Sequence, residues 1–253
     1  MRHIKAEVFS KKILNDTYVE VVFANKFNIQ PNPGQFVHIL TKATFIRRPF
    51  SIAGCTDQWV RILFKIRGPG TKKLSEVKKG MQLDIIGPLG NSFPSVDKKA
   101  KIYLVAGGIG IAPILFVAEQ FVKEKRYFKL FYGARNHKDL LIQFLPDGEY
   151  IKFFTTDDGS FGKKGTVVEV FEKKSEEEKP DIVFAAGPMK MLEKLSISCK
   201  QHNIDAYISL ENIMFCGLGV CQGCVIETID GYKRVCKEGP IFNSKKIKWN
   251  LKN

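Results

Sequence analysis

Four cysteines near the C-terminal end have the residue type and spacing that most clearly indicate chemistry. They are Cys216, Cys221, Cys224 and Cys236, in the pattern C-x4-C-x2-C-x11-C. Three thiolates on one short glycine-rich loop can surround a compact inorganic cluster, and a fourth from a following strand can complete the ligand set. This is the ligand arrangement of a plant-type [2Fe–2S] centre. Glycines in such a loop let backbone N–H groups approach the sulfur atoms.

Two other interpretations of these cysteines stay open at the level of sequence. A structural zinc site also uses four cysteines, usually as two CxxC pairs. This sequence has one CxxC pair preceded by a C-x4-C step, which favours the iron–sulfur centre. Four buried thiols without a ligand are the remaining possibility. Cys55 and Cys199 stand apart from the motif, and we expect them to be reduced, buried thiols.

Two stretches in the first hundred residues have the groups that a flavin nucleotide needs. An Arg-Pro-Phe-Ser segment offers a cation, an aromatic ring and a hydroxyl from the two faces of one extended strand. A Gly-x-Gly-Thr turn after a later strand can present N–H groups and a hydroxyl to a phosphate. The alternatives are an ordinary strand start and a plain turn. The residues concerned are Arg48, Pro49, Phe50, Ser51, Leu63, Phe64, Lys65, Gly70 and Thr71.

Glycines also follow two apolar stretches in the second half of the chain. Between a strand and a helix they let a dinucleotide pyrophosphate approach the backbone, and at a parallel strand end they line the ligand crevice. The candidate residues are Gly107, Gly108, Gly110, Ala186, Gly187 and Pro188. The first turn is not the usual G-x-G-x-x-G, and Arg135 rather than an acidic residue follows the next strand, so a structural turn is the alternative. Residues 155–160 fit either a crevice segment or an Asx turn.

Short strands must position the flavin candidates. Period-2 alternation, β-branched and aromatic residues, and intervening Gly, Pro and Asn predict six strands and one short helix before residue 95. The strands are Lys5–Phe9, Thr17–Phe23, Gln35–Leu40, Phe50–Ala53, Val60–Ile66 and Gln82–Ile86, and the helix is Leu74–Lys79. Six such strands predict a closed antiparallel β-barrel.

Strands alternate with helices in the middle of the chain. The predicted strands are Ile102–Ala106, Phe128–Tyr132, Ile151–Thr155 and Ile182–Ala186, and the predicted helices are Ile111–Lys125 and Met189–His202. This alternation predicts a doubly wound parallel sheet. We expect Lys173–Lys179 to be an exposed loop or the end of a helix.

The last part of the sequence predicts a small cluster-binding subdomain. A strand at Ala206–Leu210 precedes the cysteine loop, and a hairpin turning at Asp230-Gly231 brings Cys236 back toward it. Ile247–Leu251 is expected to add a short strand. The predicted domain limits are 1–97 for a flavin-binding β-barrel, 98–205 for an α/β nucleotide-binding domain and 206–253 for the [2Fe–2S] subdomain.

Composition excludes several classes of function. The formal net charge is +14, but the lysines are spread along the chain without a nucleic-acid-binding motif, so we expect no nucleic-acid partner. No apolar run reaches the roughly 18 residues of a membrane helix, and no signal-peptide core follows Met1. We therefore expect no membrane association and a cytoplasmic location. The four histidines have neither metal-ligand nor catalytic-triad spacing.

The order of these motifs resembles the ferredoxin–NADP⁺ reductase superfamily. Arg-Pro-Phe-Ser, Gly-Pro-Gly-Thr, Gly-Gly-Ile-Gly-Ile-Ala-Pro and Ala-Gly-Pro-Met follow one another along the chain. Ser209-Leu210-Glu211 then precedes the cysteine loop. With this ending the chain is similar, over essentially its whole length, to the electron-transfer subunits of NAD-dependent (type B) dihydroorotate dehydrogenases.

The resemblance implies three cofactors and a partner. FAD would lie in the barrel at the Arg48–Ser51, Leu63–Lys65 and Gly70–Thr71 motifs, NAD(H) in the α/β domain, and a [2Fe–2S] cluster at the cysteines. It implies that NAD(H) exchanges a hydride with FAD and that FAD exchanges single electrons with the cluster. The cluster would pass electrons to or from the FMN of a catalytic subunit in pyrimidine (UMP) biosynthesis, in a heterotetramer with two of each subunit.

The sequence departs from the superfamily at two positions. Lys65 stands where an arginine is common, and a lysine cannot make a forked contact. Ala186 stands where a cysteine is common beside the nicotinamide. Two alternatives remain at this level. One is another flavin and iron–sulfur reductase subunit of the superfamily, of the ferredoxin:NADP⁺ or sulfide dehydrogenase type, and the other is a non-catalytic zinc-binding adaptor.

Overall fold

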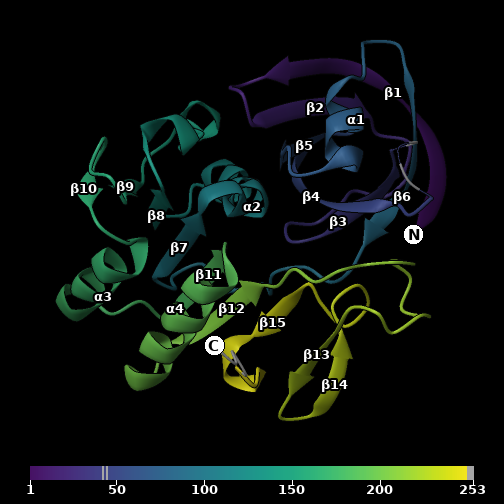
Figure 1. Cartoon of the computed structure of the whole chain (residues 1–253). Coiled ribbons are helices and arrows are strands. Elements are labelled where there is room, and N and C mark those ends of the chain that lie inside the picture. Colours follow the sequence, from purple (N-terminus) through teal and green to yellow (C-terminus); the bar gives the residue numbers. More distant parts are fainter. Residues whose placement is uncertain (42, 44, 250–253) are drawn as a thin grey trace.

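The structure is a computed structural model that describes residues 1–41, 43 and 45–249. Its N-terminal part is a closed six-stranded antiparallel barrel with the order β1-β2-β5-β4-β3-β6 (Figure 1). The strands are β1 (Arg2–Ile13), β2 (Tyr18–Ala24), β3 (Phe36–Leu40), β4 (Arg48–Cys55), β5 (Trp59–Lys65) and β6 (Gln82–Leu89). Alternate residues such as Val19, Val21 and Phe23 are fully buried inside the barrel, so the period-2 pattern correctly predicted its inner face.

The one helix of the barrel region begins earlier than the sequence pattern predicts. It is α1 (Pro69–Ser75), and not the predicted Leu74–Lys79. Gly68 is its N-cap and Pro69 occupies the first helical position, where a missing N–H costs nothing. Glu76 caps the helix at its C-terminal end. The Gly-Pro-Gly-Thr turn is therefore the first turn of this helix.

The second part of the molecule is built on a seven-stranded sheet with the strand order β10-β9-β8-β7-β11-β12-β15. The strands are β7 (Ile102–Gly107), β8 (Phe128–Ala134), β9 (Ile151–Thr156), β10 (Lys163–Lys164), β11 (Ile182–Ala186), β12 (Asp205–Ser209) and β15 (Ile241–Asn243). All pairs are parallel except β12–β15. All of β7 is buried, as expected for a strand covered on both faces.

Helices cover both faces of this sheet (Figure 1). They are α2 (Ile111–Lys123), α3 (Val167–Glu177) and α4 (Met189–Gln201), with 3₁₀ turns η1 (Gly108–Gly110), η2 (His137–Asp139), η3 (Ile142–Phe144) and η4 (Ser244–Lys246). Residues of α2 share an apolar cluster with Leu104, whereas residues of α3 and α4 share another with Tyr103 and Val105. Because adjacent residues of a strand point to opposite faces, α2 lies on one side and α3 with α4 on the other. The doubly wound sheet is thus confirmed.

Helix α3 and the short strands β10 and β15 were not predicted, and one predicted strand is absent. Helix α3 begins with a capping box in which Thr166 accepts from the N–H of Glu169, and the region 173–177 is its end. Strand β15 was missed because it has only three residues. The predicted strand Ile247–Leu251 is wrong over 247–249, and positions 250–251 lie outside the described residues. Ile241 and Phe242 take the sheet edge instead, because both are buried and pair with Ser209 and Ile208.

The C-terminal hairpin is present as predicted. It consists of β13 (Val225–Thr228) and β14 (Gly231–Arg234), with Thr228 opposite Gly231 at the turn. Figure 1 shows it next to β15, at the end of the long cysteine-containing segment that lies between it and the barrel. Strands β12 and β15, which precede and follow this segment in the sequence, both belong to the seven-stranded sheet. The domain limits 1–97, 98–205 and 206–253 stay a prediction. No helix in the described part of the chain is long and apolar enough to cross a membrane.

Helix α2 joins the two halves of the molecule. Phe116 of α2 packs into the apolar cluster inside the barrel. Glu119 of α2 forms an ion pair with Arg61 of β5, and the two side chains are 21% and 13% exposed. Arg61 also donates to the carbonyl of Ala53 in β4. This packing places the barrel next to the strand ends of the sheet, where the candidate site lies.

Candidate functional site

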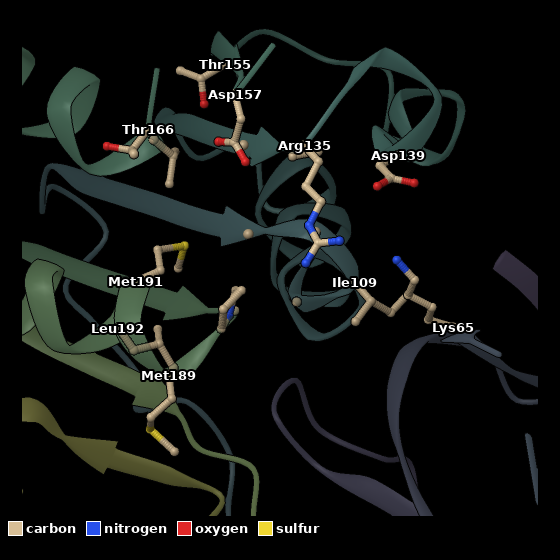
Figure 2. Close-up of a pocket in the computed structure, with 18 of the residues that line it drawn as sticks. Lys65, Ile109, Arg135, Asp139, Thr155, Asp157, Thr166, Met189, Met191 and Leu192 are labelled. Atoms are coloured by element: carbon tan, nitrogen blue, oxygen red, sulfur yellow. The ribbon is translucent and has the colours of Figure 1, made fainter. Parts of the chain in front are cut away.

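A cavity of about 580 Å³ lies between the barrel and the carboxyl ends of the parallel strands (Figure 2). Tyr18, Lys65 and Arg67 line it from the barrel side, and most other lining residues follow β7, β8, β9 and β11. Ligands of doubly wound sheets bind at this edge. Among the predicted nucleotide residues, Gly107, Gly108, Gly110, Gly187 and Pro188 line the cavity, whereas Ala186 does not and is buried at the end of β11.

The glycines at this edge have two different structural roles. A Cβ atom on Gly107 would lie 2.5 Å from Sδ of Met191, and one on Gly110 would overlap the carbonyl oxygen of Ala186. These two glycines therefore allow the ends of β7 and β11 to pack closely. Gly108 has a φ of +52°, and no heavy atom lies within 4 Å of its Cβ position. The backbone at Gly108 can thus be approached closely by a ligand in the cavity.

Charged side chains of both signs surround the cavity. Arg135, after β8, extends into it in Figure 2, and Asp157 approaches from the end of β9. Tyr18 faces the same space, with Nζ of Lys65 5.1 Å from its ring centre. Burial, and secondarily the charge of Asp139, raise the pKa of Tyr18 to about 12, so its hydroxyl stays protonated at neutral pH. The site offers cations for phosphate and acceptors for ribose hydroxyls.

Residues 155–160 fulfil both of the interpretations that the sequence left open. Thr155 and Asp157 line the cavity. The hydroxyl of Thr155 is buried and has no hydrogen-bond partner among the described residues. Asp158 accepts from the N–H and the hydroxyl of Ser160, which forms the Asx turn. The first part of the segment faces the cavity, and the second part stabilises its own turn.

Most of the residues predicted to contact a flavin lie on the adjacent strands β4 and β5, and Gly70 and Thr71 lie on α1; of all of these only Lys65 lines the cavity. Phe50 and Phe64 are buried in the barrel, with ring centres 5.3 Å apart, and Leu63 is 3% exposed. Pro49 and Ser51 pair with His38 and Phe36 of β3. The two phenylalanine rings therefore support the barrel wall.

A small polar site lies where β4 meets α1. A Cβ atom on Gly70 would lie 3.2 Å from Oγ1 of Thr41 and 3.4 Å from Nε of Arg48. The Thr41 hydroxyl is buried without a hydrogen-bond partner in the described part of the chain. An unpaired hydroxyl beside a guanidinium and a bare glycine fits a phosphate oxygen. The Thr71 hydroxyl is engaged in its own turn, accepting from the N–H groups of Arg67 and Gly68.

Each of the four cysteine sulfur atoms accepts from a backbone N–H group, three from the cysteine loop and one from Cys236 itself. Gly219 donates to Cys236 at 3.1 Å, Leu218 to Cys216 at 3.3 Å, and Gly223 to Cys221 at 3.5 Å. The N–H of Cys236 donates to Cys224, also at 3.5 Å. Positive φ angles at Gly217, Gly219 and Gln222 produce this curvature. N–H groups aimed at thiolate sulfur are the surroundings that an iron–sulfur cluster uses, so the loop fits such a cluster.

The thiols differ in acidity. Burial raises the pKa of Cys216, but N–H donors from Cys221 and Leu218 outweigh it and lower that pKa to about 6. Burial and the neighbouring Cys224 thiol raise the pKa of Cys236 to about 12. A bound metal ion deprotonates a coordinating thiol, so this difference does not prevent ligation. Within the described residues, no three His, Cys, Asp or Glu side chains already form a site for a single metal ion.

His38 of β3 lies between the flavin strand and the cysteine loop. Its side chain is fully buried, and a Cβ atom on Gly217 would overlap its ring at Nδ1. Burial lowers the pKa of His38 to about 4, although the backbone of Cys216 acts in the opposite direction. The ring is therefore neutral at physiological pH and packs directly on the loop. Sequence reasoning assigned His38 no role, because its contact with Gly217 joins distant parts of the chain.

Other site residues were also missed, although some left a signal. Tyr18, Asp139 and Met191 line the cavity without belonging to any motif, whereas Arg67 lies between the Leu63–Lys65 and Gly70–Thr71 motifs. Arg234 contacts the cysteine loop. It lies two residues before Cys236 in the predicted hairpin, and residues two apart on a strand share a face. The alternation along that strand could have indicated Arg234, whereas no sequence pattern marked Tyr18, Asp139 and Met191.

Comparison with protein-family models gives two matches. Residues 211–248 match the iron–sulfur cluster binding domain of dihydroorotate dehydrogenase B. Residues 104–196 match the oxidoreductase NAD-binding domain. The first match contains the four cysteines and favours an iron–sulfur cluster over the zinc alternative. The second contains the Gly107–Gly110 turn and the end of β11.

Similar proteins cover the whole chain. The dihydroorotate dehydrogenase B (NAD(+)) electron transfer subunit of Caldanaerobacter subterraneus subsp. tengcongensis is 38% identical, over 96% of this chain and 98% of that protein. The corresponding subunit of Clostridium perfringens is 33% identical, over 98% and 99%. Among solved structures, an NADH-dependent reduced ferredoxin–NADP oxidoreductase studied for flavin-based electron bifurcation superposes with a TM-score of 0.87. It is 26% identical over 97% of this chain and 90% of that one.

Proposed function

We propose a route for electrons through this molecule from one premise: the chain belongs to the family of electron transfer subunits of dihydroorotate dehydrogenase B (NAD(+)). It is an oxidoreductase subunit that uses FAD, a [2Fe–2S] cluster and NAD(H). The observation that carries the proposal is the loop of residues 216–224, whose N–H groups donate to three cysteine sulfur atoms, while the N–H of Cys236 donates to the fourth.

NAD(H) is proposed to occupy the cavity between the barrel and the sheet. Gly107, Gly108 and Gly110 would face its pyrophosphate, because the backbone is open at Gly108 and α2 follows directly. Gly187 and Pro188 would lie against the nicotinamide end, and Ala186 would support that turn from behind. Arg135 follows β8, where an acidic residue commonly binds the ribose hydroxyl of NAD and an arginine can meet the 2′-phosphate of NADP. Because NAD(+) stands in the relatives' names, we expect NADH to be oxidised faster than NADPH, which parallel assays would test.

FAD is proposed to bind along β4 and β5. Arg48 and Gly70, with the unpaired hydroxyl of Thr41, would hold its pyrophosphate. Pro49, Phe50, Ser51, Leu63, Phe64, Lys65 and Thr71 complete the proposed flavin contacts. When bound, FAD can accept a hydride and release single electrons, which links a two-electron donor to a one-electron cluster. The protein residues bind and orient the cofactors.

The [2Fe–2S] cluster is proposed to be ligated by Cys216, Cys221, Cys224 and Cys236, and the loop that holds it is proposed to face the partner. Cys221 is exposed at the surface. Ile213, Phe215 and Val220 are 71%, 52% and 78% exposed on the same segment. Exposed apolar side chains grouped around a redox centre suit an interface with another protein.

The partner is proposed to be an FMN-containing catalytic subunit of dihydroorotate dehydrogenase, assembled as two copies of each chain. Membership of the family implies a catalytic subunit, and the FMN and the stoichiometry are part of the proposal. In the proposed role, dihydroorotate is oxidised on the partner, and this chain exchanges the electrons with NAD in pyrimidine biosynthesis. The proposal retains the expected cytoplasmic location, which cell fractionation would test.

An absorption spectrum and two assays test the proposed function. The purified chain should show flavin bands together with broad iron–sulfur absorbance, and it should reduce a dye with NADH. It should not oxidise dihydroorotate until the catalytic subunit is added. Oxidation of dihydroorotate by this chain alone would refute the division of labour between the two subunits.

The match to the NADH-dependent reduced ferredoxin–NADP oxidoreductase favours a second candidate. In that case the chain would serve a different flavin and iron–sulfur reductase assembly. Co-purification from the native cell distinguishes the two candidates. A partner that contains FMN and oxidises dihydroorotate supports the first, and a partner that exchanges electrons with ferredoxin supports the second.

A further inference from the structure

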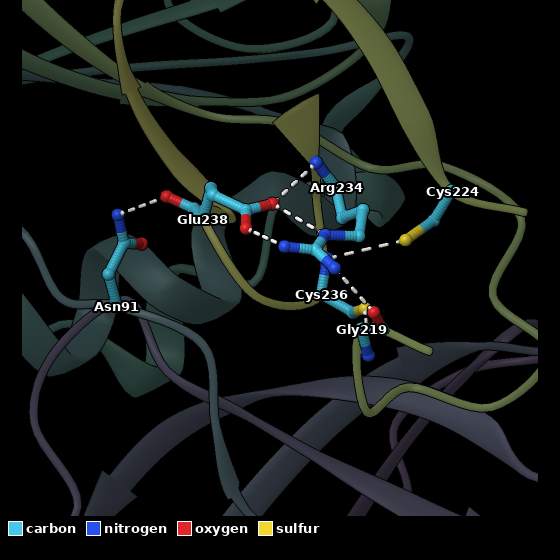
Figure 3. Close-up of polar contacts among 6 residues, drawn as sticks. All are labelled: Asn91, Gly219, Cys224, Arg234, Cys236 and Glu238. Atoms are coloured by element: carbon cyan, nitrogen blue, oxygen red, sulfur yellow. Dashed lines mark hydrogen bonds and ion pairs between the residues drawn. The ribbon is translucent and has the colours of Figure 1, made fainter. Parts of the chain in front are cut away.

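Arg234 connects the hairpin to the cysteine loop. It is the last residue of β14, two positions before Cys236. Its Nη1 atom donates to the carbonyl oxygen of Gly219 at 2.6 Å. The N–H of the same Gly219 donates to Sγ of Cys236 at 3.1 Å. The guanidinium therefore holds the residue whose N–H points at a ligand sulfur (Figure 3).

Glu238 fixes the orientation of the Arg234 side chain. One carboxylate oxygen, Oε2, accepts from the Nε atom at 3.0 Å and from the backbone N–H of Arg234 at 2.7 Å. The other oxygen, Oε1, pairs with Nη2. Both side chains are about 30% exposed. This forked contact leaves Nη1 directed at Gly219, an arrangement that a lysine cannot reproduce.

Asn91 ties this pair to the barrel. It follows β6, and its side-chain Nδ2 donates to the carbonyls of Glu238 at 2.9 Å and Ile241 at 2.8 Å. Its Oδ1 accepts from the N–H of Ile241 at 2.9 Å, and its own N–H donates to Gly239 at 2.7 Å. Figure 3 shows Glu238 between Asn91 and Arg234, with Gly219 and Cys236 beyond them. A continuous set of hydrogen bonds thus runs from the barrel to the loop.

We propose that Arg234, Glu238 and Asn91 form a clamp that positions the cysteine loop and thereby sets the reduction potential of its cluster. The clamp holds the Gly219 N–H on Cys236, and N–H···S bonds with a nearby cation stabilise the more negative, reduced cluster. Arg234 is a positioning residue because it acts through Gly219. This inference rests on the proposed iron–sulfur role of the loop.

The test compares two variants that separate geometry from charge. Arg234→Lys keeps the positive charge but loses the fork. Lys237→Gln removes one positive charge beside Gly219, against which the Lys237 side chain packs, without removing a hydrogen bond to the loop. Three measurements are made: a redox titration of the cluster, the EPR spectrum of the reduced protein, and hydrogen exchange of the 217–223 peptide after a chelator has removed the iron.

Arg234→Lys is expected to lower the equilibrium constant for cluster reduction about tenfold, which is about 59 mV for one electron. Its EPR spectrum should broaden, and the loop amides should exchange faster. Lys237→Gln should keep the wild-type EPR spectrum and exchange rates. If Arg234→Lys cannot be loaded with iron, hydrogen exchange of the 217–223 peptide in the iron-free proteins still tests the clamp, because the clamp consists of protein groups alone.

Two results would overturn the clamp. One is wild-type exchange, EPR spectrum and potential in Arg234→Lys. The other is an equal effect of both variants on all three measurements, which would leave no role for the fork. A wild-type chain that binds no iron would instead refute the proposed function, so the two failures are distinguishable.

Discussion

At Gly108 the backbone turns through a positive φ beside open space, directly before the helix that crosses to the barrel. The neighbouring glycines are restricted for a different reason, because Gly107 and Gly110 contact the end of β11. A side chain at Gly108 would meet no protein atom, so apart from the strain of the positive φ its cost would fall on the ligand. The position therefore separates cofactor binding from folding.

We expect Gly108→Ala to raise KM for NADH about tenfold, because the methyl group enters the cavity, whereas the strain of about 1 kcal/mol from the positive φ is the same with and without ligand and lowers only stability. Flavin and cluster absorbance should not change. Gly80→Ala is the matched control, since Gly80 also has a positive φ with no heavy atom within 4 Å of its Cβ position and lies in a turn before β6. Steady-state kinetics of both variants check this, and an equal rise in KM for Gly80→Ala would contradict the assignment of the cavity.

The cysteines and glycines could be selected from sequence because few residue types perform their chemistry. Asn91 could not, because it bonds residues 147 and 150 positions further along the chain. The contact of His38 with Gly217 is equally distant in sequence. Phe50 could be selected by its residue type, but the packing of its ring against Phe64 could not be predicted. Residue type predicts chemistry, whereas burial depends on the assembled fold.

Barrel closure depends on polar contacts as well as on the strand pattern. Asp84 of β6 lies beside Lys5 of β1 and Leu40 of β3, and it accepts from Arg47 and from His3. Burial acts to raise the pKa of Asp84, but these two hydrogen bonds and the Arg47 charge lower it below its ordinary value. The ionised carboxylate therefore stabilises the junction of three strands and the segment that leads into β4.

We expect Asp84→Asn to reduce the free energy of unfolding by about 1 kcal/mol at pH 7. The native pKa lies below the unfolded value of about 3.9, so the contribution is fully present above about pH 4 and is lost as the pH falls through the native pKa. Urea unfolding followed by circular dichroism at several pH values checks this. Glu76→Gln, at an exposed ion pair with Lys73, should leave the midpoint unchanged. A loss of unchanged size at a pH below the native pKa of Asp84 would contradict the ionic explanation.

Elements with strong local signals were predicted well, and those set by tertiary contacts were not. All six barrel strands and the buried strands β7 and β11 follow from periodicity and apolar runs. Helix α1 was misplaced because Gly68 and Pro69 were interpreted as a turn, although Pro is favourable at a first helical position. Strand β15 is too short to show a period, and its pairing with β12 places it at the sheet edge.

At the scale of the whole molecule, α2 and Asn91 connect parts that the motifs describe separately. Helix α2 places the cavity against the barrel through Phe116 and the Glu119–Arg61 pair. Asn91 connects the barrel to the cysteine segment from the other side. The two proposed cofactor sites and the cluster loop therefore all lie next to the barrel. Cys221, in the cluster loop, is exposed at the molecular surface.

We expect Cys221→Ser to separate the two halves of the electron route. Reduction of FAD by NADH should remain, because the cavity and the flavin residues are untouched, whereas reduction of the catalytic subunit should fall to background. Cys55→Ser is the control, since Cys55 lies in the barrel near Gln30 and Pro31. Stopped-flow flavin bleaching and a partner-reduction assay measure the two steps. Unchanged partner reduction in Cys221→Ser would show that electrons leave by another path.

The pairing of Ser209 with Ile241 has a consequence for how the protein matures in the cell. The cysteine segment leaves the sheet at β12 and returns at β15, so its two ends are held side by side by strand hydrogen bonds and by Asn91. Neither anchor requires iron. The sheet can therefore close through protein groups alone, independently of the cluster. A damaged cluster could then be rebuilt in the same polypeptide.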